Sequence, residues 1–186
     1  MFSAPAAALS QAAPATRPAT AADVAFVQGM IQHHGQALEM TALISERTQR
    51  ADLKNLGERV TVSQRDEIAM MSQWLKARGE QAASPMQHDG HAAEHVMGQV
   101  MGQIMPGMLT AAQMDSLRAS RGTAFDRLFL RLMIQHHEGA LTMVKDLLAT
   151  PRAAQEPQLF SFVSDVDTDQ RAEIARMKAL LDTIRH

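Results

Sequence analysis

The sequence Met-Ile-Gln-His-His occurs twice in this chain of 186 residues, at positions 30–34 and again at positions 133–137. The identity extends further, because ten positions between 23 and 40 recur at a constant offset of 103 residues. A second pair of segments shares six positions between 64 and 71, at an offset of 106 residues. Two halves of similar sequence indicate a duplicated unit, so we expect one domain built from two related halves.

Apolar residues recur at helical spacing in four long segments, and no segment shows the sustained alternation that is typical of a strand. Thr20 and Asp23 form a candidate capping box at the start of the first segment. The predicted helices cover approximately residues 20–47, 51–78, 123–149 and 157–186. The expected fold class is therefore all-α, with four main helices in a bundle and no sheet.

The two halves are separated by a connector that is too long for a tight turn. We expect a single helical-bundle domain at 23–181, with repeat halves at about 23–79 and 123–181 and a connector at 80–122. Within the connector, Thr110 and Gln113 are placed to cap a short helix that ends near Ser120. Residues 1–22 lack the basic start and continuous apolar run of a complete signal peptide, which predicts a truncated leader or a disordered tail.

Composition excludes several classes of function. The chain has no Cys, which excludes disulfides, thiolate zinc sites and iron–sulfur clusters, whereas 14 Met and eight His are present. The net charge of -2, with no basic run, argues against nucleic-acid binding. No run of 18 apolar residues is present, so we expect no transmembrane helix. Any soft metal ion must therefore bind through thioether and imidazole groups.

Methionine and histidine share one broad helix face in each half. Thioethers and neutral imidazoles suit Cu(I), whereas imidazole with carboxylate suits Cu(II) or zinc. Glu67 and Met71 lie on a face of the second helix that could meet His33 and His34 across the bundle. The candidate ligands on the helices are Met30, His33, His34, Met40, Glu67, Met71, Met133, His136, His137, Met143, Glu173 and Met177.

A packing role remains open for the same residues. In that alternative the methionines fill the core, one histidine of each pair bonds to Glu67 or Glu173, and the other histidine is solvated. We predict that Met40 and Met143, which lie farther along their helices, form a neighbouring site if metal is bound.

The connector adds a second group of candidate ligands. They are His88, His91, His95, Met97, Met101, Met105 and Met108. Pro106 and Gly107 predict a turn that brings the flanking sulfurs near each other, which makes a half-site for a soft ion. The alternative is a mobile linker whose methionines cover the end of the bundle.

The common catalytic motifs are missing. The chain contains no Glu-x-x-His, which a carboxylate-bridged di-iron bundle requires, and no His-Glu-x-x-His, nucleophile elbow or Gly-rich phosphate loop. We therefore expect a protein that is not an enzyme. A metal-dependent oxidase is the less favoured alternative, because it would need open coordination positions.

The stretches FVQGMIQHHGQALEM, RDEIAMMSQWL, MPGMLTAAQMDSLRASRGTAFDRLFLRLMIQHHEGALTMV and DQRAEIARMKALL resemble the domain-of-unknown-function 305 family, which includes CopM-like periplasmic copper-binding proteins. The resemblance covers most of residues 23–181. It implies a ferritin-like four-helix bundle from a duplicated helical hairpin, export in bacteria, and copper binding or copper tolerance. It places the family's His-His, Met and Glu positions on the helix candidates named above, and its turn methionines on Met105 and Met108.

One departure separates the two copies. Gly35-Gln36 stands where the second copy has Glu138-Gly139, so the first half lacks a carboxylate next to its histidine pair. The two sites therefore need not be equivalent.

The sequence thus predicts an exported copper-binding protein, periplasmic or secreted, that buffers, sequesters or hands on copper, with Cu(I) preferred over Cu(II). Its expected partners are copper ions and other copper-handling proteins. The alternative is a helical protein-interaction module that binds metals only adventitiously.

Overall fold

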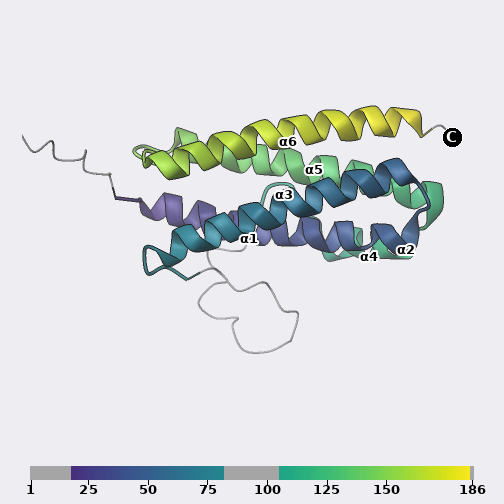
Figure 1. The fold of residues 1–186 in the computed structure, drawn as a ribbon, viewed down its shortest axis with the longest axis horizontal. Helices are drawn as coiled ribbons and strands as arrows, with labels where there is room; N and C mark the ends of the chain where they lie inside the picture. Colours follow the sequence, from purple (N-terminus) through teal and green to yellow (C-terminus); the bar gives the residue numbers. More distant parts are fainter. Residues whose placement is uncertain (1–17, 82–104, 185–186) are drawn as a thin grey trace, which may run out of the picture.

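The computed structural model describes residues 18–81 and 105–184, and every regular element within them is a helix (Figure 1). The expected all-helical class is confirmed. The helices are α1 (Ala21–Ala42), α2 (Ile44–Arg47), α3 (Ala51–Lys76), α4 (Ala111–Ala119), α5 (Gly122–Ala149) and α6 (Pro157–Thr183). None of these helices is long and apolar enough to cross a membrane.

The four long helices lie side by side along the long axis of the molecule (Figure 1). Helix α1 packs along α3, α5 packs along α6, and the two pairs meet mainly where α1 crosses α5. Figure 1 also shows that α3 and α5 run in the same direction, whereas α1 and α5 are antiparallel. A connector of this length permits either direction for α5, and the structure has α5 parallel to α3.

The first predicted helix is interrupted at Leu43, which corrects the expectation of one helix up to Arg47. The hydroxyl of Thr41 donates to the carbonyl of Leu38, and the Leu43 amide bonds to Met40 in a tighter turn. A side chain that competes with the backbone for hydrogen bonds weakens the α-helical pattern locally. The chain therefore bends before α2, which brings Ile44 directly against Gly57 of α3.

Two capping boxes are present as predicted. The Thr20 hydroxyl accepts from the Asp23 amide, and the Asp23 carboxylate accepts from the Thr20 amide. Thr110 and Gln113 make the same reciprocal pair at the start of α4. Because Thr20 is the cap, α1 begins at Ala21, so the expected tail at 1–22 extends too far.

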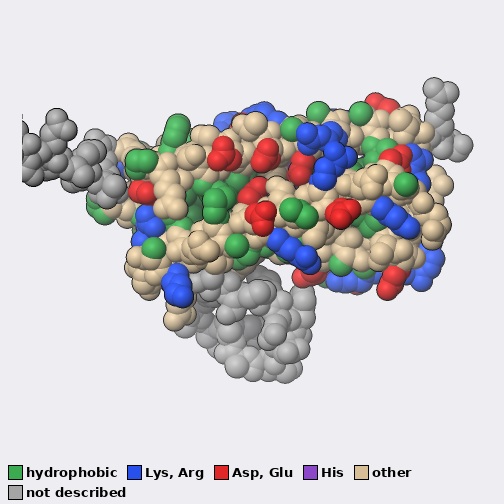
Figure 2. All heavy atoms as spheres, in the orientation of Figure 1, with side chains coloured by type: hydrophobic (Ala, Val, Ile, Leu, Met, Phe, Trp, Pro, Cys, Tyr) green, Lys and Arg blue, Asp and Glu red, His purple; other side chains and the backbone are tan. Residues whose placement is uncertain are grey.

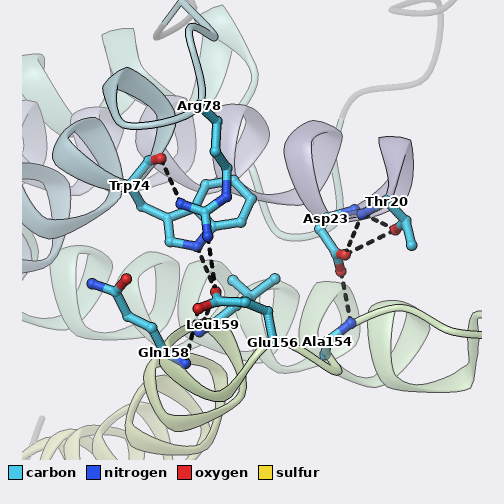
Figure 3. Close-up of polar contacts among 8 residues, drawn as sticks. All are labelled: Thr20, Asp23, Trp74, Arg78, Ala154, Glu156, Gln158 and Leu159. Carbon is cyan, nitrogen blue, oxygen red and sulfur yellow. Dashed lines mark hydrogen bonds and ion pairs between the residues drawn. The ribbon is translucent and has the colours of Figure 1, made fainter. Parts of the chain in front are cut away.

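One end of the bundle is closed by polar contacts between the two helix pairs (Figure 3). Asp23 accepts from the backbone amide of Ala154, 2.7 Å away, in the loop between α5 and α6. Trp74 donates to Glu156 over 2.9 Å, and the Arg78 guanidinium lies 3.8 Å above the Trp74 ring. Glu156 also caps α6. These contacts fix α1 and α3 against the start of α6.

The core is divided into three layers along the bundle axis. One hydrophobic cluster contains Met30, Met71 and Trp74, and the other contains Met40, Met133 and Met177. In each long helix, the residues between these clusters are buried and polar. They are His33, His34, Gln64, Glu67, His136, His137, Gln170 and Glu173. We call this set the polar layer. A fully buried polar layer costs folding free energy unless its groups are hydrogen-bonded or bind a ligand.

Candidate metal centre

The four helix histidines meet in the middle of the polar layer, and all four are 0% exposed. The rings of His33 on α1 and His136 on α5 lie with their centroids 3.8 Å apart and their planes tilted by 39°. The neighbouring rings are farther away, at 6.4 Å from His33 to His34 and 6.2 Å from His136 to His137. His33 and His136, the inner histidines, therefore form one pair across the two halves of the chain. The packing alternative, in which one histidine of each pair is solvated, is wrong on this point.

His34 and His137, the outer histidines, each bond to a carboxylate of the partner helix in their own half. His34 Nε2 contacts Glu67 Oε2, and His137 Nε2 lies 2.6 Å from Glu173 Oε2. Sequence spacing predicts that Glu67 meets both His33 and His34, and the structure confirms only the contact with His34. An ionised carboxylate accepts hydrogen bonds, so it holds the Nε2–H of each outer imidazole in a fixed direction.

The inner histidines have different surroundings. His33 Nε2 lies 3.0 Å from the carbonyl oxygen of Pro106. A carbonyl only accepts, so the neutral His33 ring donates from Nε2 and carries its lone pair on Nδ1. Neither ring nitrogen of His136 has a hydrogen-bond partner within the described part of the chain. The Nδ1 atoms of His33, His34 and His137 are likewise unpartnered among the described residues.

Both inner histidines are held in the neutral form. Burial lowers the pKa of His33 from 6.5 to about 3, repulsion between protonated His33 and protonated His34 adds to this effect, and the Pro106 carbonyl opposes it. Burial also lowers the pKa of His136 well below its usual value, and the repulsion that a protonated His136 would meet from a protonated His33 or His137 lowers it further. The His33 backbone raises the pKa of His136, but this smallest effect does not offset the others. Neutral imidazole is the form that binds metals.

The predicted methionine ligands divide between the two hydrophobic clusters. Met30 and Met71 lie in one cluster and Met133 and Met177 in the other, and each is at most 2% exposed. Their thioethers therefore border the polar layer from both sides. This placement suits a core role as well as a ligand role.

Met40 and Met143 do not form a common site. Met40 is buried in the cluster of Met133, whereas Met143 packs against the other cluster. A Cβ atom at Gly29 would lie 3.3 Å from Met105 Sδ and 3.5 Å from Met143 Cε. Met143 is therefore close to Met105, because both side chains cover Gly29.

The predicted turn at Pro106-Gly107 is present, with the Met108 amide 3.1 Å from the Met105 carbonyl and a φ of +79° at Gly107. It lies against α5 at Gly139, which the sequence did not identify as a functional position. The sequence signal for this position was the exchange of Gly35-Gln36 for Glu138-Gly139. The expected role of Glu138, as a carboxylate next to its histidine pair, is wrong. Glu138 is exposed and pairs with Lys178 at 3.1 Å, so it contributes no carboxylate to the histidines.

Five of the predicted ligands, His88, His91, His95, Met97 and Met101, lie outside the described residues. Within residues 18–81 and 105–184, no group of three or more histidine and carboxylate side chains is arranged to hold a metal ion. A site at the inner histidines therefore requires thioether ligands or a rotation of the side chains.

The model of one protein family, described as "Domain of unknown function (DUF305)", matches residues 23–181. No curated protein matches the chain.

Several solved structures have the same fold. A DUF305 fragment from Deinococcus radiodurans is 32% identical, with a TM-score of 0.73, and the match covers 90% of this chain and 99% of that one. A DUF305 protein from Streptomyces coelicolor that is inferred to be secreted is 27% identical, with a TM-score of 0.72 and coverage of 88% and 93%. CopM in the Cu(II)-bound form is 26% identical, with a TM-score of 0.66 and coverage of 88% and 97%.

Proposed function

This chain belongs to the DUF305 family, and we propose that it binds copper ions with the buried histidines at the centre of its bundle. The bundle is a ferritin-like one, built from a duplicated helical hairpin. The protein is exported to the periplasm or secreted, and it buffers, sequesters or hands on copper to other copper-handling proteins, which contributes to copper tolerance. It is not an enzyme, so we expect no copper oxidation beyond the amount of copper that the protein itself binds.

The observation that carries this proposal is the pair of inner histidines, His33 and His136. Their rings are 3.8 Å apart, neutral and inaccessible to solvent, and three of their four nitrogens have no hydrogen-bond partner among the described residues. An unpartnered buried polar group costs about 1 to 3 kcal/mol, and a protein keeps such groups where they serve a ligand. Two imidazoles from different halves can supply two ligands to one shared ion.

The surrounding groups favour a soft ion. The thioethers of Met30 and Met133 come from the helical turns that precede His34 and His137, and the chain offers no thiolate. Imidazole and thioether together suit Cu(I). Glu67 and Glu173 orient the outer imidazoles, as carboxylates commonly orient metal-binding histidines. If His34 with Glu67 and His137 with Glu173 also bind copper, the carboxylate oxygens would favour Cu(II).

Two relatives support the proposal. CopM was solved with Cu(II), and its fold matches this chain over 88% of the length. The Streptomyces coelicolor relative is inferred to be secreted, which agrees with export and with the missing cysteines. The remaining candidates, Met105, Met108, Met143 and the connector residues between 88 and 101, would serve as collectors that deliver copper to the centre.

The test is an anaerobic titration of the metal-free full chain with Cu(I) against a competing chelator. We expect tight binding that is lost when His33, His34, His136 and His137 are all replaced by Ala. A matched variant with Ala at His88, His91 and His95 reports on the connector alone. Unchanged binding by the fourfold helix variant would refute the proposed centre. Circular dichroism shows whether that variant remains folded.

A helical interaction module is the second candidate function. A half-open cavity of about 270 Å³ lies between α3 and α6, lined by Met70, Met71, Trp74, Phe162 and Asp165 among others. Figure 2 shows hydrophobic side chains gathered in this hollow, with acidic side chains beside it. This function predicts weak copper binding, and it predicts that replacement of the helix histidines lowers the free energy of unfolding without changing metal affinity.

A further inference from the structure

Residues 105–109, which we call the strap, lie across the inner histidines and contact both α1 and α5. The Pro106 carbonyl oxygen is 3.0 Å from His33 Nε2. It is the one hydrogen-bond partner that the inner pair has among the described side chains and backbone groups. The position of the strap therefore decides whether His33 has this acceptor.

Gln36 of α1 fastens one end of the strap. Its amide nitrogen donates to the carbonyl oxygen of Leu109 over 3.0 Å, and its amide oxygen accepts from the Leu109 backbone amide over 2.7 Å. Two antiparallel hydrogen bonds from one side chain fix both the distance and the orientation of a backbone segment. Gln36 is one helical turn from His33, so it sets the strap at the height of that ring.

Gly139 of α5 admits the other side of the strap. A Cβ atom at Gly139 would lie 2.1 Å from the Pro106 carbonyl oxygen and 2.4 Å from Gly107 Cα. A Cβ atom at Gly107 would equally meet the carbonyl oxygens of Gln135 and His136 at 2.7 Å. Both glycines are therefore needed for this close approach, and Gly107 also has a positive φ.

We propose that the strap is a positioning element that fixes the tautomer of His33, with Gln36 and Gly139 as the residues that hold it in place. The Pro106 carbonyl accepts a hydrogen bond from the Nε2–H of the neutral ring. This leaves the lone pair of His33 on Nδ1, the atom that binds the ion. The strap thereby does for His33 what Glu67 and Glu173 do for the outer histidines. The role in metal binding rests on the proposed function, whereas the role in the tautomer does not.

The two inner histidines are therefore unequal before any ion binds. His33 is restricted to one tautomer by the strap, whereas His136 has no partner among the described residues that selects between its two tautomers. Loss of the hydrogen bond that orients a metal-binding histidine typically weakens metal affinity by about 10- to 100-fold. Release of the strap should have an effect in this range through His33.

The experiment compares the full chain with its Gln36→Ala and Gln28→Ala variants. Gln28 is the matched control, because it lies on the same helix and its amide also donates to a backbone carbonyl, that of Gln81, over 2.9 Å. The ¹⁵N chemical shifts of the histidine rings, measured without metal, report which nitrogen of His33 is protonated. Affinity for Ag(I), a redox-inert probe for soft monovalent ions, is measured by competition with a chelator.

We expect the unmodified chain and Gln28→Ala to show His33 protonated on Nε2 alone. Gln36→Ala should show a mixture of tautomers at His33 and an affinity for Ag(I) that is weaker by about tenfold or more. An unchanged tautomer in Gln36→Ala would overturn the proposal, and so would a mixed tautomer with unchanged affinity. If the unmodified chain binds no Ag(I), the proposed function fails while the ¹⁵N shifts still decide the role of the strap in the tautomer.

Gly139→Ala provides a second route to the same state, because it displaces the strap from the side of α5. It should produce the same mixture of tautomers at His33 with Gln36 intact. Circular dichroism and the urea midpoint establish that each variant is folded before the shifts are compared. A Gly139→Ala protein that is folded and keeps His33 protonated on Nε2 would contradict the positioning role.

Discussion

The two halves of the polar layer repeat one contact and differ in almost everything around it. His34 bonds to Glu67 in the first half, and His137 bonds to Glu173 in the second. The inner histidines have diverged, because His33 bonds to the strap and His136 has no hydrogen-bond partner among the described residues. The repeated outer contact orients a ring within each half, whereas the inner pair exists only where the halves meet.

The carboxylates have diverged as well. In the first half the Ser63 hydroxyl donates to Glu67 over 3.1 Å. The position that corresponds to Ser63 in the second half is Asp169, one helical turn before Glu173. Partial burial, and then the charges of Glu67 and Glu173, raise the pKa of Asp169. The first half thus adds a hydroxyl donor to its carboxylate, whereas the second half has in the same position an acid whose charge acts on both Glu67 and Glu173.

The largest expected effect concerns pH and the inner pair. The pKa of His33 is about 3 in the folded protein and 6.5 in the unfolded chain, and that of His136 is lowered in the same direction. Above pH 6.5 both histidines are neutral in the folded and the unfolded chain. As the pH falls from 6.5 towards 3, the unfolded chain takes up protons that the buried rings do not, so the folded protein loses stability. The free energy of unfolding should fall by up to about 1.4 kcal/mol per pH unit for each histidine.

Urea denaturation between about pH 7 and pH 5 checks this slope, because most carboxylates remain ionised there. His33→Gln and His136→Gln should each remove an equal share of it, which would make the two rings alike in titration although their contacts differ. A slope that neither substitution changes would show that other groups control the acid sensitivity.

The next effect compares the two outer pairs. Glu67→Ala should lower the free energy of unfolding by about 2 to 3 kcal/mol, because it leaves a buried imidazole N–H without its charged acceptor. Glu173→Ala should cost less, since Glu67 also accepts the hydrogen bond from Ser63, which Glu67→Ala would remove as well. Chemical denaturation at neutral pH measures both, with Asp66→Ala as the control on an exposed neighbour. Equal losses would remove the distinction between the two carboxylates.

Substitution of two helix glycines by Ala should change the free energy of unfolding by smaller amounts and in opposite directions. Gly139→Ala should destabilise the fold by about 2 kcal/mol, because the added methyl group would overlap the Pro106 carbonyl. Gly35→Ala should stabilise it by about 0.5 kcal/mol, because no atom of residues 18–81 or 105–184 lies within 4 Å of the added atom and Ala favours a helix. Thermal unfolding of both variants gives the signs, and the same sign for both would contradict the close approach of the strap.

The smallest expected effects come from substitutions of Ser63 and Asp169, the neighbours of the two buried carboxylates. Ser63→Ala should lower the free energy of unfolding by about 0.5 to 1 kcal/mol through the lost hydrogen bond to Glu67. Asp169→Ser, which copies the first half, should raise it by about 0.2 to 0.5 kcal/mol at low salt. Denaturation in low and high salt separates the two, since only the Asp169 effect should fade at high ionic strength.

The sequence predicts local structure well because the relevant contacts are local. The capping boxes at Thr20 and Thr110 and the turn at Pro106-Gly107 depend on residues two or three positions apart. The contact between His34 and Glu67 also follows, because helical spacing puts each side chain on a face towards the other helix of its pair. The same spacing cannot distinguish His34 from His33, which lies only one residue away.

The remaining features arise from the crossing of elements that are far apart in the chain. The pairing of His33 with His136 depends on how α1 crosses α5, and neither helix sequence specifies that crossing alone. The contact of His33 with Pro106 uses a backbone carbonyl, which leaves no mark on the pattern of side chains. The exchange of Gly35-Gln36 for Glu138-Gly139 marks the correct positions in the sequence. Their role depends on the strap, which lies between Gln36 and Gly139 and is distant from Gln36 in the chain.

The measurement that tests the shared centre most directly is a count of tightly bound Cu(I) ions by anaerobic chelator competition, for the unmodified chain, His33→Ala, His136→Ala and the double variant. If His33 and His136 hold one ion between them, each single substitution removes one ion and the double substitution removes no more. If each half binds its own ion, the double variant will lose two ions, and that result would contradict a shared centre.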